Sequence, residues 1–198
     1  MKTLLMDTAW KNLVLALFED GELKAGFSRE AFKKQSETLF VELKKLLEQT
    51  GWSLKDLDEV IITDGPGSYT GLRMAMTAAK ILGTQQPIAV KTISTLQLYA
   101  GTAPAANVLL DARGGRVYAG HIENGKPQWM GILPLEETAA FLGANPGVLY
   151  GEGELIGLPA EPHDFLKNAR NLLPLALKVE NVDALVPRYM KESDSYRV

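Results

Sequence analysis

The chain has 198 residues, of which 46% are hydrophobic and 23% charged, and it carries a net charge of −3. That length suits one large domain or two small ones. The absence of cysteine excludes disulfides and thiolate metal sites, and it fits the reducing cytoplasm. The negative charge argues against strong nucleic-acid binding by the chain alone. No apolar run approaches the roughly 20 residues that cross a bilayer, so we expect no membrane span.

Two similar segments, one in each half of the chain, are the most informative feature of the sequence. Each has an apolar run that ends in an aspartate (Asp7, Asp111), a second strand, and a turn that ends in glycine (Gly21, Gly125). An offset of 104 residues carries one segment onto the other without a gap. Asp-Gly and Asn-Gly favour two-residue hairpin turns. We predict a duplicated fold of two lobes that face each other across a cleft; the alternative is two unrelated hairpins.

The remaining elements follow from periodicity and from the residues that begin and end helices. Ser36 is the expected N-cap of the first helix, and Gly51 and Gly83 are expected to end the first and second helices. The order of elements predicts an α/β protein with mixed sheets. Small, irregular residues near 101–106 place the domain boundary so that the lobes are 1–102 and 103–198. Expected strands are 2–7, 12–18, 22–28, 60–63, 88–90, 107–111, 116–122, 129–133 and 148–150; expected helices are 36–49, 69–82, 134–142 and one near 163–178.

A glycine-rich loop joins the strand at 60–63 to the second helix. Gly65, Gly67 and Ser68 precede a helix N-terminus, where free N–H groups suit an anion such as phosphate. The spacing is not that of a P-loop, which requires Gly-Lys-Ser/Thr. These three residues are our candidate cofactor-binding residues; the alternative is that the glycines only form a tight turn.

The first two helices carry more apolar residues than one core-facing stripe requires. Small residues on the second helix allow another helix to approach closely. We therefore predict that these helices contact a partner protein, because a monomer seldom exposes a large apolar patch. The candidate interface residues are Leu39, Phe40, Leu43, Leu72, Met76 and Ala79.

The sequence offers few catalytic groups. The two histidines, His121 and His163, have no metal-site spacing, and we predict neither a metal site nor catalytic residues. Asp7 and Asp111 could hold Mg²⁺ through water in a small autonomous ATPase or kinase that uses the cleft. We favour a turn-capping role for both, in which the carboxylate accepts backbone N–H groups.

The motifs together resemble the bacterial TsaB family, also called YeaZ. They are Asp7-Thr8, Gln35-Ser36-Glu37, Gly65-Pro-Gly-Ser-Tyr-Thr-Gly-Leu-Arg73, Ala79-Lys80, Asp111-Ala-Arg113, Val117-Tyr118 and Pro187-Arg-Tyr-Met-Lys191. They occur in the expected order over nearly the whole chain. Two positions depart from the pattern: Gln35 stands where many members have His, and Lys191 where Arg is usual.

The resemblance implies a fold, a role and partners. The fold is the two-lobed, duplicated RNase H-like fold of actin, Hsc70 and sugar kinases. The role is that of a non-catalytic subunit in the synthesis of threonylcarbamoyladenosine in tRNA. The expected partners are a TsaD-like transferase, bound through the first two helices, and a TsaE-like ATPase near that junction. A homodimer is expected when the partner is absent, tRNA contact only through the complex, and ATP or ADP with Mg²⁺ at the partner interface as the candidate cofactor.

Overall fold

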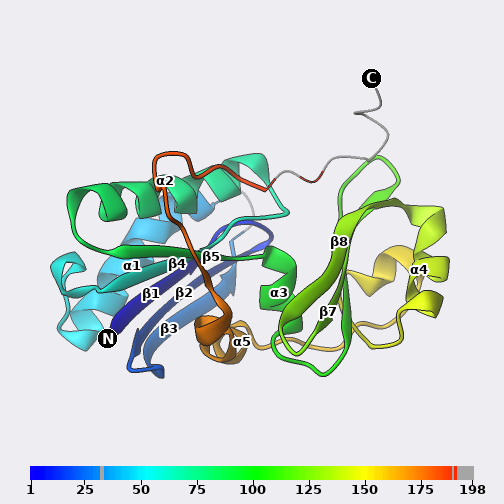
Figure 1. Ribbon diagram of the computed structural model, residues 1–198, viewed down its shortest axis with the longest axis horizontal. Coiled ribbons are helices and arrows are strands. Elements are labelled where there is room, and N and C mark those ends of the chain that lie inside the picture. The colour runs from blue at the N-terminus through cyan, green and yellow to red at the C-terminus, as the bar shows by residue number, and fades with distance from the viewer. Residues whose placement is uncertain (32–33, 189, 191–198) are drawn as a thin grey trace.

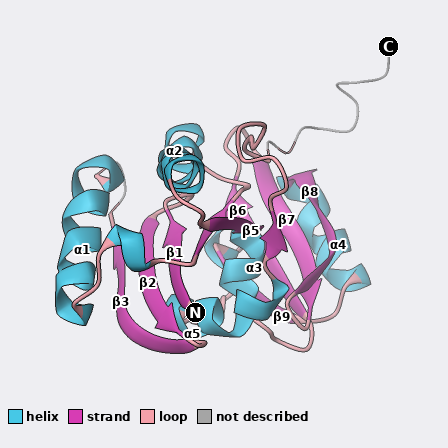
Figure 2. Cartoon of the chain, turned by 60° about the vertical axis from the view of Figure 1, so that its left-hand side comes forward, coloured by secondary structure: helices cyan, strands magenta, loops and turns pink. Residues whose placement is uncertain are grey.

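A computed structural model describes residues 1–31, 34–188 and 190. Tyr189 and Lys191 of the C-terminal motif lie outside the described residues. Two sheets, each backed by helices, lie side by side with further helices between them (Figures 1 and 2).

The first sheet joins hairpins to parallel crossovers, as the element order predicts. Its strand order is β10-β5-β4-β1-β2-β3. Strands β1 and β2 are antiparallel, as are β2 and β3, whereas β4 runs parallel to β1 and to β5. The strands are β1 (Lys2–Asp7), β2 (Asn12–Glu19), β3 (Glu22–Glu30), β4 (Glu59–Thr63), β5 (Ala89–Ile93) and β10 (Leu177–Lys178).

The second sheet repeats the inner part of the first. Its order is β8-β7-β6-β9, and β9 runs parallel to β6 as β4 does to β1. The strands are β6 (Ala106–Asp111), β7 (Arg116–Glu123), β8 (Lys126–Pro134) and β9 (Val148–Gly151). In both hairpins the turn residues have positive φ, namely Asp20-Gly21 and Asn124-Gly125, as two-residue turns require. The duplicated two-lobed α/β fold is therefore confirmed.

The strand register corrects one detail of the predicted repeat. β2 and β3 match β7 and β8 at the offset of 104, since both pairs bulge at the corresponding place. Asp7, however, pairs with Val14, and the residue at that offset from Val14 is Tyr118, which pairs with Leu110. Asp111 therefore lies one residue beyond the counterpart of Asp7. A one-residue shift turns a side chain to the opposite face of a sheet, so the two aspartates are not equivalent.

Helices fill three layers around the two sheets. Helices α1 (Gln35–Thr50) and α2 (Tyr69–Gln85) cover the outer face of the first sheet. Helices α3 (Thr95–Ala100) and α5 (Phe165–Leu172) lie between the sheets, within an apolar core that both lobes share (Figure 1). Helix α4 (Thr138–Ala144) covers part of the outer face of the second sheet. Short 3-10 turns occupy Leu54–Asp56, Leu135–Glu137, Gly153–Ile156 and Leu173–Leu175.

The C-terminal segment returns to the first lobe, which changes the expected division at 102/103. The second sheet ends at Gly151, and β10 pairs with β5 of the first sheet. The strap that follows β10 is held by Lys80, which donates to the carbonyl of Asp183, and by an Arg188–Asp64 ion pair at 3.0 Å. The helix expected near 163–178 is therefore limited to α5, and the chain continues as a strap along α2.

Several helix ends also differ from the expected positions. The N-cap residue of α1 is Lys34 rather than Ser36, and it makes no side-chain cap. The helix ends as expected, with Gly51 at φ 70°. Helix α2 continues past Gly83 to Gln85, and Gly83 packs closely on Val90 within the helix. Within the described part of the chain, no helix is long and apolar enough to cross a membrane.

Candidate functional site

The glycine loop packs the N-terminus of α2 closely against the β1–β2 connection. A Cβ atom on Gly67 would lie 2.3 Å from the carbonyl oxygen of Ala9, and one on Gly71 would lie 2.0 Å from that of Thr8. The hydroxyl of Thr8 donates to the carbonyl of Gly71 at 2.6 Å. Such close backbone contacts exclude any side chain at the two glycines. The loop therefore fixes where α2 begins.

The three candidate cofactor-binding residues have structural contacts of their own. Gly65, at φ 129°, lies against the carbonyl of Arg188, and its own carbonyl accepts the amide of Thr95. The hydroxyl of Ser68 accepts the amide of Gly71 at the start of α2. Gly67 and Ser68 line the cleft between the lobes, whereas Gly65 does not. Their assignment to a cofactor stays a prediction.

Seated in this way, α2 leaves an apolar groove between itself and α1. The groove has a volume of about 470 Å³ and is lined almost entirely by apolar atoms. Phe40 on α1 is 58% exposed and Ile81 on α2 is 50% exposed. At one end, Arg73 donates to the hydroxyl of Tyr69 at 2.8 Å. The lining residues are Met6, Phe40, Leu43, Leu54, Thr70, Arg73, Met74, Thr77, Ala78, Ile81 and Leu82.

Most of the residues predicted for the partner interface are buried in this chain's own core. Of the six, only Phe40 is exposed; the buried ones are Leu39, Leu43, Leu72, Met76 and Ala79. Leu43 also forms part of the groove floor. The physical reason is that the most regular apolar stripe of each helix faces the sheet, where it buries the most surface.

The exposed and half-buried groove residues that the sequence prediction missed lie on a second side of α2. Met74, Thr77 and Ile81 follow one another at spacings of three and four residues, so they share a side of the helix. That spacing was readable in the sequence. What could not be read was which of the two sides the sheet would cover.

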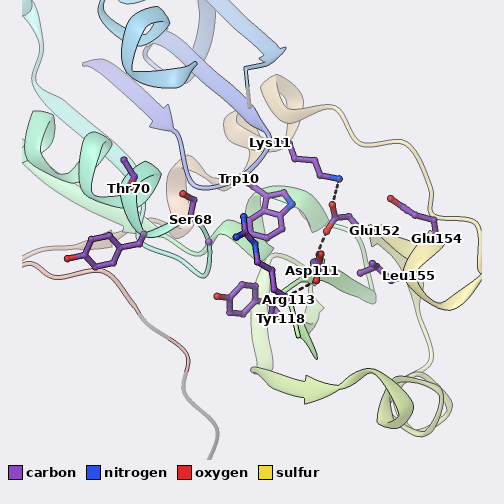
Figure 3. A pocket seen from close by; sticks show the side chains of 13 residues that line it. Trp10, Lys11, Ser68, Thr70, Asp111, Arg113, Tyr118, Glu152, Glu154 and Leu155 are labelled. Carbon is purple, nitrogen blue, oxygen red and sulfur yellow. Dashed lines mark hydrogen bonds and ion pairs between the residues drawn. The ribbon is translucent and has the colours of Figure 1, made fainter. Parts of the chain in front are cut away.

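A polar cleft lies between the lobes, on the other side of the α2 N-terminus (Figure 3). Its volume is about 570 Å³. Lys11 from the first lobe forms an ion pair with Glu152 from the second, and Glu152 also accepts the amide of Asp111 at 2.6 Å. Trp10 meets Tyr118 edge to face across the same cleft at 6.1 Å. The lining residues are Trp10, Lys11, Gly67, Ser68, Tyr69, Thr70, Asp111, Ala112, Arg113, Tyr118, Glu152, Glu154 and Leu155.

The two aspartates cap turns, as predicted. Asp7 accepts the amide of Ala9 at 2.9 Å, and Asp111 accepts the amide of Arg113 at 2.7 Å. Asp7 is 1% exposed and also accepts the hydroxyl of Thr63. Burial raises the pKa of Asp7 to about 6. Asp111 lines the cleft whereas Asp7 does not, so the two carboxylates do not form a facing pair.

The arrangement is poorly suited to holding a metal ion through carboxylates. Among residues 1–31, 34–188 and 190, no group of three or more His, Asp or Glu side chains could hold one. The Asp7 carboxylate is buried and does not line the cleft, so a hydrated Mg²⁺ ion in the cleft would not reach it. The groove therefore presents an apolar surface, whereas the cleft presents polar side chains from both lobes.

Comparison with known proteins agrees with this geometry. The family model described as "TsaD: tRNA N6-adenosine threonylcarbamoyltransferase" matches residues 28–132, more than half of the chain. A solved structure, "YeaZ from Pseudomonas aeruginosa", superposes with a TM-score of 0.78 over 96% of this chain and 99% of that one, at 22% identity. That superposition shows that the two chains share one fold.

Two curated relatives carry the same name, "tRNA threonylcarbamoyladenosine biosynthesis protein TsaB". The one from Bacillus subtilis (strain 168) is 31% identical over 61% of this chain and 54% of its own length. The one from Escherichia coli (strain K12) is 32% identical over 72% of this chain and 62% of its own length. The chain thus spans between about half and two thirds of these relatives.

Replacing Gly71 tests the seat of α2. We expect Gly71→Ala to lower the free energy of unfolding by more than about 2 kcal/mol, because its Cβ would overlap the carbonyl of Thr8. Gly143→Ala in α4 is the matched control, since nothing lies within 4 Å of its Cβ position. There we expect a gain of about 0.5–1 kcal/mol from helix propensity. Denaturant unfolding measures the free energy of unfolding of both variants. Equal changes in the two variants would contradict the close packing at Gly71.

Replacing Asp7 tests the raised pKa of its buried carboxyl group. Its pKa rises from 3.8 to about 6 on folding, so the folded chain holds a proton that the unfolded chain has lost between those pH values. Stability from this group is present below pH 4 and is lost as the pH rises through about 6. Asp7→Asn cannot ionise, so the variant should gain up to about 3 kcal/mol over the unmodified chain between pH 4 and pH 7.5. A pH-independent difference in unfolding free energy would contradict this.

Proposed function

The chain belongs to the family of the TsaD model, in its TsaB/YeaZ group, and from that premise we propose that it is a non-catalytic subunit for making threonylcarbamoyladenosine in tRNA. In this proposal it acts in the cytoplasm as a scaffold for a TsaD-like transferase. The observation that carries the proposal is the uncovered apolar groove between α1 and α2.

The groove has the chemistry of a helix-docking surface. Phe40 and Ile81 form two exposed ridges, and Thr77 and Ala78 lie between them as a floor of small side chains. Small residues between larger ones let a second pair of helices pack closely and form a four-helix bundle. An apolar groove of this kind is costly to leave in water, which favours a protein partner. We propose that the helices of the TsaD-like subunit occupy it.

The contacts of Asp7 and Asp111 support the scaffold role. The buried Asp7 carboxylate accepts the hydroxyl of Thr63 and the amide of Ala9, and the Asp111 carboxylate accepts the amide of Arg113. Neither carboxylate is arranged to receive Mg-ATP together with the other. No observation favours the alternative of an autonomous ATPase or kinase over the scaffold.

The remaining contacts of the proposed complex follow the family pattern. A TsaE-like ATPase docks near the junction of the two subunits, and tRNA is contacted through the complex, in keeping with the net charge of −3. When the transferase is absent, a second copy of this chain covers the groove. ATP or ADP with Mg²⁺ is the candidate ligand at the junction.

The pairing is tested by placing a charge on the exposed ridges. Phe40→Glu and Ile81→Glu should weaken binding to the TsaD-like subunit by about 100-fold or more, because each buries an unpaired carboxylate at the interface. Both side chains are exposed in the chain alone, so each variant should keep its fold. Calorimetric titration of the transferase subunit into each variant gives the measurement.

A matched control separates docking from general surface change. Leu177 is 64% exposed, but it lies on β10 rather than in the groove. Leu177→Glu should leave the affinity within about twofold of the unmodified chain. If Leu177→Glu and Ile81→Glu weaken binding equally, or if the unmodified chain does not bind the transferase, the proposed docking surface is refuted.

The non-catalytic role has its own test. The purified chain with Mg-ATP should release phosphate no faster than the buffer, and Asp7→Asn should change nothing in that measurement. Steady phosphate release by the chain alone, lost in Asp7→Asn, would support the autonomous ATPase instead.

A further inference from the structure

Strand β8 forms a margin of the second sheet with an open edge. The sheet order places β7 on one side of it, and no strand of the described residues pairs on its other side (Figure 2). None of its nine residues is fully buried, and Trp129 is 40% exposed. An unpaired strand presents a row of free backbone N–H and C=O groups, which is a template for another strand.

The duplication supplies a comparison within the same molecule. β3 holds the matching place in the first sheet, but it differs from β8 in its packing and its charge. α5 packs against it, with Leu166 pressed on Gly26 and Arg170 paired with Glu22. β3 also carries four charged residues besides its apolar ones, namely Glu22, Lys24, Arg29 and Glu30, whereas β8 carries only Lys126. Charged side chains are a usual means of blocking edge pairing, and β8 has none after Lys126.

The ladder with β7 shows which groups of β8 face outward. The amide of Leu135 donates to the carbonyl of Gly115 at 2.8 Å. Backbone groups of an antiparallel strand alternate between its two sides, so Gly131, two pairs earlier, also bonds to β7. Met130 and Ile132 then direct their N–H and C=O groups to the open edge.

Two prolines limit the open stretch. Pro134 has no N–H and lies at an edge-facing position of this alternation, where a proline costs no ladder bond. The bulge shifts the alternation by one residue, so Pro127 also faces the edge. The bulge next to Pro127 ends the regular edge on that side. The segment that can pair is therefore short and centred on Gly131.

We propose that β8 pairs antiparallel with β8 of a second copy of this chain, about a two-fold axis at Gly131. In that register Met130 of each copy lies opposite Ile132 of the other, and each such pair exchanges both backbone hydrogen bonds. A two-fold contact uses the same strand in both copies, so a self-complementary edge suffices to form it. The two small sheets become one continuous sheet.

Charge complementarity selects this occupant and this register. With Gly131 on the axis, Lys126 of one copy is brought toward Glu136 of the other, and the two-fold axis repeats the contact. Both residues are exposed or partly exposed in the single chain. Glu137 adds negative charge at the same end. A basic start and an acidic end make the strand complementary to itself only when antiparallel.

The same register gives Trp129 a partner. Its ring lies over Gly131 and against Phe141, with ring centroids 5.1 Å apart, and Leu133 of the second copy would lie opposite it. Cross-strand pairs of aromatic and aliphatic residues stabilise sheets, and tryptophan is common at the centre of interfaces. This surface is separate from the α1–α2 groove, so the inference goes beyond the proposed function.

The first test measures self-association with the groove disabled. In the full chain carrying Ile81→Glu, sedimentation equilibrium at up to about 1 mM should still show a monomer–dimer equilibrium. Adding Lys126→Glu should raise the dissociation constant by about tenfold at low salt, since attraction becomes repulsion at two symmetric places. Adding Glu136→Lys as well should restore it. A chain that stays monomeric in the Ile81→Glu background overturns the proposal.

Hydrogen exchange locates the contact at single residues. The amides of Met130 and Ile132 should exchange quickly at low concentration and become protected as the dimer forms. The amide of Gly131 is the internal control, because it bonds to β7 and should be protected at every concentration. A dimer whose Met130 and Ile132 amides stay unprotected, or whose strength ignores the charge reversal, uses a different surface and overturns the proposal.

Discussion

The close contact between the start of α2 and the β1–β2 connection is the constraint on which the rest depends. Two backbone carbonyls, of Thr8 and Ala9, occupy the space that side chains would need at Gly71 and Gly67. This contact fixes the start of α2. One side of the helix then faces α1 across the groove, and its N-terminus lines the interlobe cleft. The glycines that suggest a phosphate loop in the sequence thus also serve protein packing against protein.

Burial then decides which side of each helix remains for a partner. Periodicity correctly predicted both helices and their surplus of apolar residues, but it assigned the wrong side to the surface. Leu39 and Leu72 lie on the apolar stripes of their helices. They pack against the sheet because that contact buries more of their apolar surface than a position facing solvent would. Phe40 lies outside that stripe and is the predicted residue that stays exposed. A single sequence shows how apolar a helix is, and the neighbouring sheet decides which side is left over.

The repeat shows a similar limit. The strands, turns and two-lobed order were readable because hairpin turns and apolar runs are local signals. The equivalence of Asp7 and Asp111 was not, because it depends on the register in which the two strands of each hairpin pair. One residue of difference places Leu110 in the shared core at the position that corresponds to Asp7. Similar letters at a constant offset therefore do not ensure similar faces, since side chains alternate along a strand.

The two lobes differ in the helices that cover the outer face of their sheets. This difference explains why the exposed apolar surface is not spread evenly. In the first lobe, 16- and 17-residue helices back the sheet and leave one groove between them. In the second, a 7-residue helix covers less of the outer face, so Trp129 stays partly exposed beside an uncharged edge. The groove lies over the outer face of one sheet, and the open edge belongs to the other sheet. Since no residue is shared between them, a protein bound in the groove would not compete for the edge, and binding at the two surfaces should be thermodynamically independent.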